Sequence, residues 1–244
     1  IIIKTGAKWG LRGSNDEFDN TFWGAMIVSE GAPNELPQKR AHPRAHAEVS
    51  AILLTSGTTG TPKAVQVKRS GISNHLFHLE NTMAHVSLNR TLVCSSPSFD
   101  GIFEDFYFPL TQGGTVVFKK AGTMSRIANF NHEISNRNIS ILNLNTTLWS
   151  TWVGSEYFAP SETLQSVNVG GGRMDNQLVK KWFDYYEGNS KTPQLLNGYG
   201  PTETTVTSTL HHVQKCDAEK DSIPIGKPQN GVVIRLLDES YRLT

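Results

Sequence analysis

A run of small hydroxyl residues and glycines stands directly before a lysine in LLTSGTTGTPKAV, residues 53–65. Glycines let successive backbone N–H groups converge on an anion, and the hydroxyls add donors. Lys63 adds a positive charge beside the stiff Pro62. The stretch has little volume for core packing, so it predicts a phosphate-binding loop, with a flexible linker as the alternative. It is not a Walker A loop, because Ala64 follows the lysine.

Two further stretches follow in a fixed order, NGYGPTETT at 197–205 and IPIGKPQNGVVIRLLDES at 223–240. Together with TSGTTGTPKAV they resemble the motifs of the adenylate-forming enzymes. That family comprises acyl-CoA ligases, luciferases and the adenylation domains of nonribosomal peptide synthetases. The resemblance covers roughly residues 48–240, and Ala64 departs from it because glycine is usual there.

The resemblance implies an ATP site that holds Mg²⁺, with Lys63, Thr202 and Glu203 as its catalytic residues. Tyr199 would lie against adenine, Asn197 would hydrogen-bond the adenine edge, and Thr202 would reach the α-phosphate. Glu203 would hold the metal, since a hard cation prefers carboxylate oxygen. Outside this motif the same tyrosine and glutamate would be taken for a core aromatic residue and a surface acid. The implied ATP-binding residues are Thr55, Ser56, Gly57, Thr58, Thr59, Gly60, Lys63, Gly171, Gly172, Asn197, Tyr199, Gly200 and Thr202.

The stretch PSFDGIFEDFYFPLTQGG, residues 97–114, resembles the pattern with which peptide synthetases hold an amino acid. Asp100 falls where that family anchors the substrate's α-ammonium group. A buried carboxylate is costly unless it is paired, and an α-amino acid supplies the partner. A helix N-cap is the alternative role for this aspartate. Ile102 and Asp105 depart from the usual serine and glutamate, and Gly172 stands where the family has a larger or acidic residue.

The family's substrate-lining positions carry over to a set that mixes glycines with polar side chains. Three glycines predict a wide cavity, and buried polar groups reject substrates that leave them unpaired. We therefore expect a long polar side chain with hydrogen-bond donors. An ornithine derivative fits, such as the acylated N-hydroxyornithines of fungal siderophore synthetases, while lysine, arginine and glutamine relatives stay open. The lining residues are Asp100, Gly101, Glu104, Asn143, Asn168, Gly170, Gly198, Val206 and Thr207.

The implied reaction joins the amino acid to AMP and then transfers it to the phosphopantetheine thiol of a carrier domain. The implied partners are the peptidyl carrier and condensation domains of the same synthetase. Two alternatives remain, an acyl-CoA ligase and a catalytically idle adenylation-like scaffold. The family's ribose-binding aspartate, hinge and C-terminal subdomain with its lysine are expected beyond residue 244. Residues 1–244 alone are therefore expected to bind ATP poorly and to turn over little.

Composition sets outer limits on these interpretations. The 244 residues are 37% hydrophobic and 18% charged with a net charge of +1, so neither nucleic acid nor an anionic membrane is favoured as the partner. No apolar stretch approaches the length of a membrane span. Two cysteines make neither a disulfide framework nor a zinc site, which predicts a reducing compartment, the cytoplasm.

Strand-like runs alternate with helical patterns, and this predicts an α/β fold with mostly parallel sheets flanked by helices. By resemblance it is part of the large N-terminal subdomain of the adenylate-forming fold. Residues 1–47 are expected to be an irregular upstream part, and residues 48–244 the central part. A helix is expected to carry Ile72, Leu76, Leu79, Met83 and Val86 on one side, and another to begin at the N-cap Asp175. Strands are expected at 51–56, 91–96, 115–118, 139–145, 164–170, 194–200 and 231–238.

Four of the loops after these strands carry the residues of interest, at 56–63, 97–105, 170–172 and 198–203. Ligands of open α/β sheets lie beyond the carboxyl ends of the strands. The sequence therefore predicts that these loops share one cleft.

Overall fold

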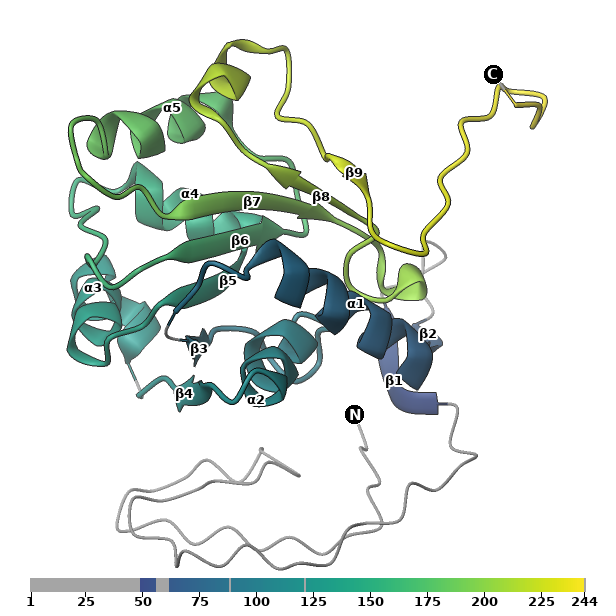
Figure 1. The fold of residues 1–244 in the computed structure, drawn as a ribbon, viewed down its shortest axis with the longest axis horizontal. Coiled ribbons are helices and arrows are strands. Elements are labelled where there is room, and N and C mark those ends of the chain that lie inside the picture. The colour runs from purple at the N-terminus through teal and green to yellow at the C-terminus, as the bar shows by residue number, and fades with distance from the viewer. Residues whose placement is uncertain (1–48, 56–61, 88, 121, 244) are drawn as a thin grey trace, which may run out of the picture.

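A computed structural model describes residues 49–55, 62–87, 89–120 and 122–243. Its centre is a seven-stranded sheet in the order β4-β3-β5-β6-β7-β8-β9 (Figure 1). The strands from β4 to β7 run parallel, while β8 and β9 are added antiparallel. The predicted α/β class with a mostly parallel sheet is thus confirmed. The strands are β3 (Arg90–Val93), β4 (Thr115–Phe118), β5 (Ile141–Asn145), β6 (Ser166–Gly170), β7 (Gln194–Tyr199), β8 (Thr209–His212) and β9 (Lys227–Pro228).

The strand expected at 51–56 does not join this sheet. It is β1 (Val49–Thr55), which pairs antiparallel with β2 (Lys63–Lys68) in a separate two-stranded sheet. Leu53 and Val67 are buried, whereas Ile52 and Leu54 are exposed, so the strand is half-buried and not fully buried as expected. Strand β2 was not predicted, although its residues alternate between exposed and buried.

The helices have the amphipathic patterns that bury one side against the sheet. Helix α1 (Arg69–Thr82) buries Ile72, Leu76 and Leu79, as predicted, but it ends at Thr82, so Met83 and Val86 lie beyond the helix. Helix α5 begins after Asp175, whose side chain accepts hydrogen bonds from the backbone N–H groups of Gln177 and Leu178, so the predicted N-cap is confirmed. The other helical segments are η1 (Phe103–Tyr107, a π-helix), α2 (Phe108–Thr111), η2 (Thr123–Ser125), α3 (Ile127–Asn136), α4 (Thr146–Gly154), α5 (Asn176–Tyr185), η3 (Thr202–Thr204) and η4 (Lys215–Glu219).

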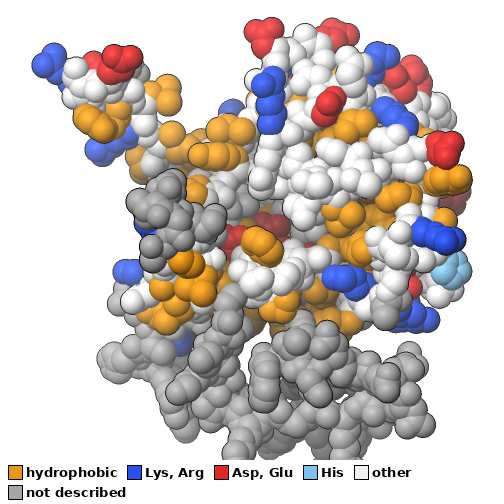
Figure 2. Space-filling view, turned by 180° about the vertical axis from the view of Figure 1, so that it is seen from behind, with side chains coloured by type: hydrophobic (Ala, Val, Ile, Leu, Met, Phe, Trp, Pro, Cys, Tyr) orange, Lys and Arg blue, Asp and Glu red, His pale blue; other side chains and the backbone are white. Residues whose placement is uncertain are grey.

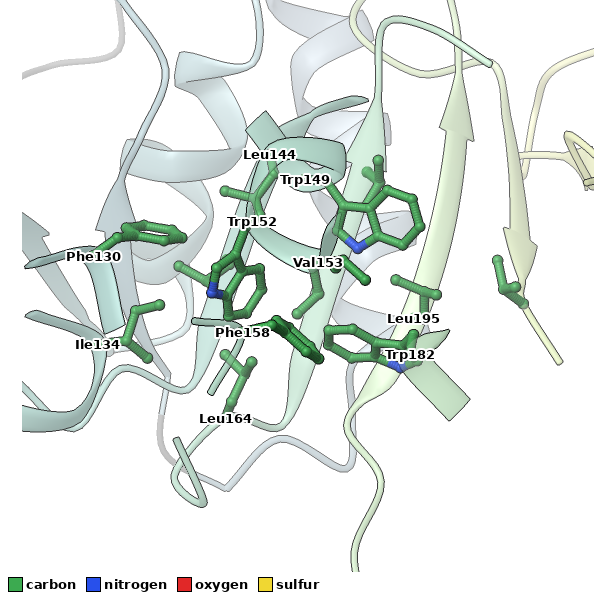
Figure 3. Close-up of a cluster of buried hydrophobic side chains, with 14 of the residues drawn as sticks. Phe130, Ile134, Leu144, Trp149, Trp152, Val153, Phe158, Leu164, Trp182 and Leu195 are labelled. Carbon is green, nitrogen blue, oxygen red and sulfur yellow. The ribbon is translucent and has the colours of Figure 1, made fainter. Parts of the chain in front are cut away.

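One face of the sheet packs against α3, α4 and α5 through an aromatic cluster (Figure 3). Trp152 lies at its centre, edge-on to Phe130 and Phe158 at ring-centroid distances of 5.4 and 5.1 Å. Its indole N–H donates to Asn131 Oδ1 at 2.7 Å. This apolar layer packs against one face of the sheet, and the site described below lies on the opposite face.

The opposite face is covered by α1, η1 and the β1–β2 hairpin (Figure 1). Ile141 of β5 and Leu196 of β7 face this second cluster, while their neighbours Leu142 and Leu195 face the aromatic one. This alternation follows from the two-residue period of a strand. Two residues further along, the same face carries Asn143 in β5 and Gly198 in β7 in place of large apolar residues.

One expected strand does not form, and another ends earlier than expected. No strand forms at 231–238, where Val233 and Leu236 are 77% and 73% exposed and only an isolated bridge joins Leu237 to Leu243. Hydrophobic alternation needs a neighbouring strand and a surface to cover, and no described residue supplies them. The strand expected at 91–96 ends at Val93, because the next two backbone N–H groups bind a carboxylate. In the described part of the chain, no helix is long and apolar enough to cross a membrane.

Replacing Trp152 should test the aromatic layer. Trp152→Ala removes a fully buried indole and leaves a cavity, so we expect the free energy of unfolding in urea to fall by about 3–5 kcal/mol. Tyr157→Ala is the matched control, because that ring is 62% exposed and should change stability by less than about 1 kcal/mol. Equal losses for the two variants would show that this cluster is not the core.

Candidate active site

A cavity of about 460 Å³ lies on the α1 face of the sheet, between η1 and the carboxyl ends of β5, β6 and β7. The sequence-predicted substrate positions are all among its lining residues. The molecular surface seen in Figure 2 is hollowed near its centre, and acidic side chains lie recessed there. The predicted residues that line the cavity are Asp100, Gly101, Glu104, Asn143, Asn168, Gly170, Gly198, Val206 and Thr207.

Sheet register brings four of these residues together. Asn143 of β5 pairs with Asn168 of β6, and Gly170 pairs with Gly198 of β7. Residues paired in a parallel sheet lie on the same face, so two amides and two glycines form the cavity floor. A Cβ atom on Gly198 would lie 3.3 Å from Asn168 Oδ1, and the absence of side chains there keeps the floor open.

Asp100 lies in the turn before η1 and links the two predicted ligand motifs. The Thr202 side chain and the backbone N–H groups at residues 100 and 101 lie beside its carboxylate and act on its pKa as hydrogen-bond donors. Burial raises the pKa of this carboxyl, and the nearby Glu104 charge adds to the rise, while those hydrogen bonds oppose it. A half-buried carboxylate of this kind is ready to pair with a cation.

Glu104, one helical turn further on, is already satisfied by the protein. Its Oε1 accepts from His75 Nε2 at 2.8 Å and from Thr207 Oγ1 at 3.3 Å. Its Oε2 accepts from Asn168 Nδ2 at 2.7 Å. The polar groups that line this part of the cavity are therefore fixed in orientation by one buried carboxylate.

Asp105, where the family has glutamate, is not among the residues that line the cavity and instead holds the framework. Its Oδ2 accepts from the backbone N–H groups of Cys94 and Ser95 at 2.9 and 2.7 Å, and its Oδ1 accepts from Asn143 Nδ2 at 3.0 Å. Burial raises the pKa of Asp105 to about 6, against the lowering effect of these donors. These bonds end β3 and orient Asn143.

Two acceptor atoms of the floor have no partner among the described residues, Asn143 Oδ1 and Asn168 Oδ1. Each amide nitrogen is held by a carboxylate, which leaves the oxygen as the unpaired end. An unpaired buried acceptor costs about 1–3 kcal/mol, and a ligand donor would remove that cost. The floor therefore suits side chains that carry N–H or O–H groups.

The turn after β7 is closed tightly around this cavity. A Cβ atom on Gly200 would lie 2.5 Å from the Val206 carbonyl oxygen, so only glycine fits there. Thr205 and Val206 have φ angles of +67° and +61°, which are unfavourable for β-branched residues. The strain presents Val206 to the cavity. Sequence reasoning could not foresee this backbone, because the residue types argue against it.

The predicted nucleotide residues lie around the same end of the sheet, though not all line the cavity. Gly171, with φ of +81°, and Gly200 line it, while the exposed Gly172 does not. Tyr199 is 52% exposed, so its ring is open to a ligand. Asn197 is buried and donates to the Pro224 carbonyl oxygen at 2.8 Å, a structural contact that sequence reasoning missed.

The predicted catalytic residues come from two adjacent segments. Lys63 is the exposed first residue of β2, and β2 packs against η3, which contains Thr202 and Glu203. Thr55, the last residue of β1, pairs with Lys63. Residues 56–60 of the predicted phosphate loop fall outside the described part of the chain.

A magnesium ion fits the donor set at η3 but would need ligand oxygens as well. Glu203 is exposed there, and the described residues contain no group of three or more His, Cys, Asp or Glu side chains placed to hold a metal. Mg²⁺ commonly binds through one or two carboxylates plus substrate phosphates. The predicted metal role of Glu203 remains compatible with this arrangement.

Comparison with known proteins decides the family, because residues 11–243 match the family model of the AMP-binding enzymes. The chain belongs to that family. Within it, the similar proteins place this AMP-binding chain with the adenylation domains of nonribosomal peptide synthetases. The resemblance drawn from the motifs is thereby confirmed, whereas a fungal siderophore origin is not shown.

Three relatives describe the similarity of this AMP-binding chain. Tyrocidine synthase 3 of Brevibacillus parabrevis is 30% identical over 196 residues, which is 80% of this chain and 3% of that protein. A dimodular nonribosomal peptide synthase of Bacillus subtilis (strain 168) is 31% identical over 193 residues, 78% of this chain and 8% of that protein. A solved peptide synthetase protein with adenylation and PCP domains has a TM-score of 0.71 at 28% identity, covering 85% of this chain and 41% of that one. The chain thus spans less than half the length of each.

Replacing Asp105 should change the pH dependence of stability. Because its pKa is raised from 3.8 to about 6 in the folded protein, its protonation favours folding. This contribution is complete below about pH 4 and is lost as the pH rises through about 6. Relative to Asp105→Asn, the free energy of unfolding of the unmodified chain should therefore fall by up to about 3 kcal/mol from pH 4 to pH 7. Urea denaturation at each pH measures it, and a constant difference would contradict the burial of this carboxylate.

Proposed function

We propose that this AMP-binding chain holds ATP, Mg²⁺ and an amino acid around one cavity and supports activation of that amino acid as an aminoacyl-adenylate. The observation that carries the proposal is that the Thr202 side chain lies close enough to the Asp100 carboxylate to lower its pKa. This places Asp100, which is suited to the α-ammonium group of an amino acid, beside Thr202, which is suited to the α-phosphate of ATP. An amino acid anchored at Asp100 would therefore have its carboxylate near the nucleotide.

In this reaction a carboxylate oxygen of the amino acid attacks the α-phosphorus of ATP. One oxygen–phosphorus bond forms, and the bond from that phosphorus to the bridging oxygen of pyrophosphate breaks. Both reactants are anionic, so catalysis depends mainly on alignment and on offsetting their repulsion. Lys63 and the N–H groups of the Ser/Thr/Gly loop would hold the leaving phosphates, and Thr202 would orient the α-phosphate. Mg²⁺, held by Glu203, would neutralise developing charge on the phosphate oxygens.

For the amino acid itself we propose a long side chain with hydrogen-bond donors, of the ornithine type, for example an acylated N-hydroxyornithine. Support comes from the unpaired oxygens of Asn143 and Asn168 and from the glycines of the cavity floor. A small aliphatic side chain would leave both oxygens unpaired. Lysine, arginine and glutamine relatives satisfy the same acceptors and remain candidates.

We further propose that residues 48–244 act as the central part of an adenylation domain's large subdomain, in the cytoplasm. Relatives such as the solved protein with adenylation and PCP domains support a carrier domain as the recipient of the activated acid. The acceptor group would be a phosphopantetheine thiol, and a condensation domain would be the next partner. These statements concern the whole synthetase.

Replacing Asp100 tests the proposed function through ATP–pyrophosphate exchange with a panel of amino acids. Removing one partner of a buried ion pair costs about 3–5 kcal/mol, so Asp100→Ala should lower exchange more than a hundredfold. Asp221→Ala is the control, because Asp221 is exposed and lies outside the cavity lining.

An Asp100→Ala protein with undiminished activation of its acid would favour an acyl-CoA ligase instead. Exchange with no amino acid at all, from the complete synthetase, would favour an idle scaffold. A clear preference for a small aliphatic amino acid would refute the ornithine-type substrate.

A further inference from the structure

A buried histidine stands behind the cavity and contacts one of its acidic lining residues. His75 of α1 is 1% exposed and Glu104 of η1 is 5% exposed. His75 Nε2 lies 2.8 Å from Glu104 Oε1. His75 itself is not among the residues that line the cavity, so its effect on a ligand must act through Glu104.

The second imidazole nitrogen is also engaged. Nδ1 of His75 lies 3.2 Å from Oε1 and 3.0 Å from Nε2 of the Gln229 amide. Because an amide can rotate to present its oxygen, Gln229 is able to accept from a protonated Nδ1. Both nitrogens of an imidazolium ion would then have acceptors, one of them a carboxylate.

Because His75 and Glu104 are buried, the net charge of the pair affects which ligands the cavity can bind. A buried carboxylate is strongly unfavourable without a counter-ion, and His75, at 2.8 Å from Glu104, would supply one when its ring carries both protons. The other charged group of the cavity, Asp100, is the partner proposed for the substrate's α-ammonium. A protonated His75 would give Glu104 a positive partner within the protein, and the remaining acceptor capacity of the Glu104 Oε2 atom would then suit a neutral donor.

We propose that His75 is the internal counter-ion of Glu104 and makes the cavity select a neutral, donor-bearing side chain over a cationic one. The inference rests on the proposed amino-acid site and narrows its substrate to acylated or otherwise uncharged ornithine-type side chains. The side-chain ammonium group of free ornithine or lysine would lose its hydration beside Glu104 without gaining a counter-ion. His75 acts as a positioning residue, since it reaches the substrate only through Glu104.

The test compares N5-acetyl-L-ornithine with L-ornithine, which share a backbone and differ in side-chain charge. Calorimetric binding and ATP–pyrophosphate exchange are measured on the complete synthetase with both compounds. The unmodified protein should prefer the acetylated compound at least tenfold. His75→Gln keeps an N–H donor for Glu104 but removes the positive charge, so this preference should fall at least tenfold.

Two further variants separate charge from packing. Glu104→Gln should keep the preference for the acetylated compound within about threefold. An uncharged imidazole beside the new amide leaves this part of the cavity without net charge, as the ion pair does in the unmodified protein. His75→Gln combined with Glu104→Gln should restore a preference lost in His75→Gln. The matched control is His211→Gln, which removes a histidine paired with the buried Asp217 at 2.7 Å outside the cavity lining and should leave the preference unchanged. Thermal melting checks that each variant is folded.

The outcomes distinguish this inference from the proposed function. Exchange that persists in His75→Gln with an unchanged preference would overturn the counter-ion role and leave the function standing. A tenfold or greater loss of ornithine binding in Glu104→Gln would also overturn it, because Glu104 would then serve as the substrate's own counter-ion. A binding preference that shifts as expected without any exchange would support the counter-ion and overturn the adenylation. Binding of neither compound would overturn the inference.

Discussion

The placement of the Thr202 side chain beside the Asp100 carboxylate is the constraint around which this site is arranged, because a half-buried carboxylate needs partners. Thr202 is brought there by the closed turn after β7, where the backbone at Gly200 runs against Val206. The start of α1 packs against the same turn, since a Cβ atom on Gly71 would lie 2.7 Å from Thr205 Oγ1. Asp100 arrives from the other side, at the end of the loop after β3. Two distant motifs thus meet at one pair of side chains.

Three carboxylates within six residues have different partners, and these partners set their different roles. Asp105 is held by the backbone after β3 and by Asn143, so it supports the framework. Glu104 is surrounded by His75, Asn168 and Thr207, so its carboxylate oxygens already have partners within the protein. Asp100 alone of the three lies half-exposed at the cavity, with its pKa raised by burial, and is open to a cation from outside. A single acidic segment can therefore provide structure, selectivity and anchoring at once.

The parallel strands β5, β6 and β7 were predictable, because each is a buried run. The pairing of their residues follows once they are placed side by side in one sheet. The cavity lining followed from motif resemblance, and its residues do lie together. The hairpin strand β2 was missed, because six residues after a glycine-rich loop gave too short a pattern to separate from that loop. The strand expected at 231–238 failed because alternation alone supplies no partner strand. Contacts of His75 could not be foreseen, since Glu104 and Gln229 lie 29 and 154 residues away in the sequence.

A crystal structure of the complete synthetase with a hydrolysis-resistant aminoacyl-adenylate analogue would test most directly whether one cavity serves both the amino acid and the nucleotide. The account predicts the analogue's ammonium group within hydrogen-bond distance of the Asp100 carboxylate, and its phosphate-mimicking group beside Thr202. Its side chain should extend toward Asn143 and Asn168. An analogue bound with its ammonium group away from Asp100, or with its two halves on surfaces that do not connect, would contradict the account.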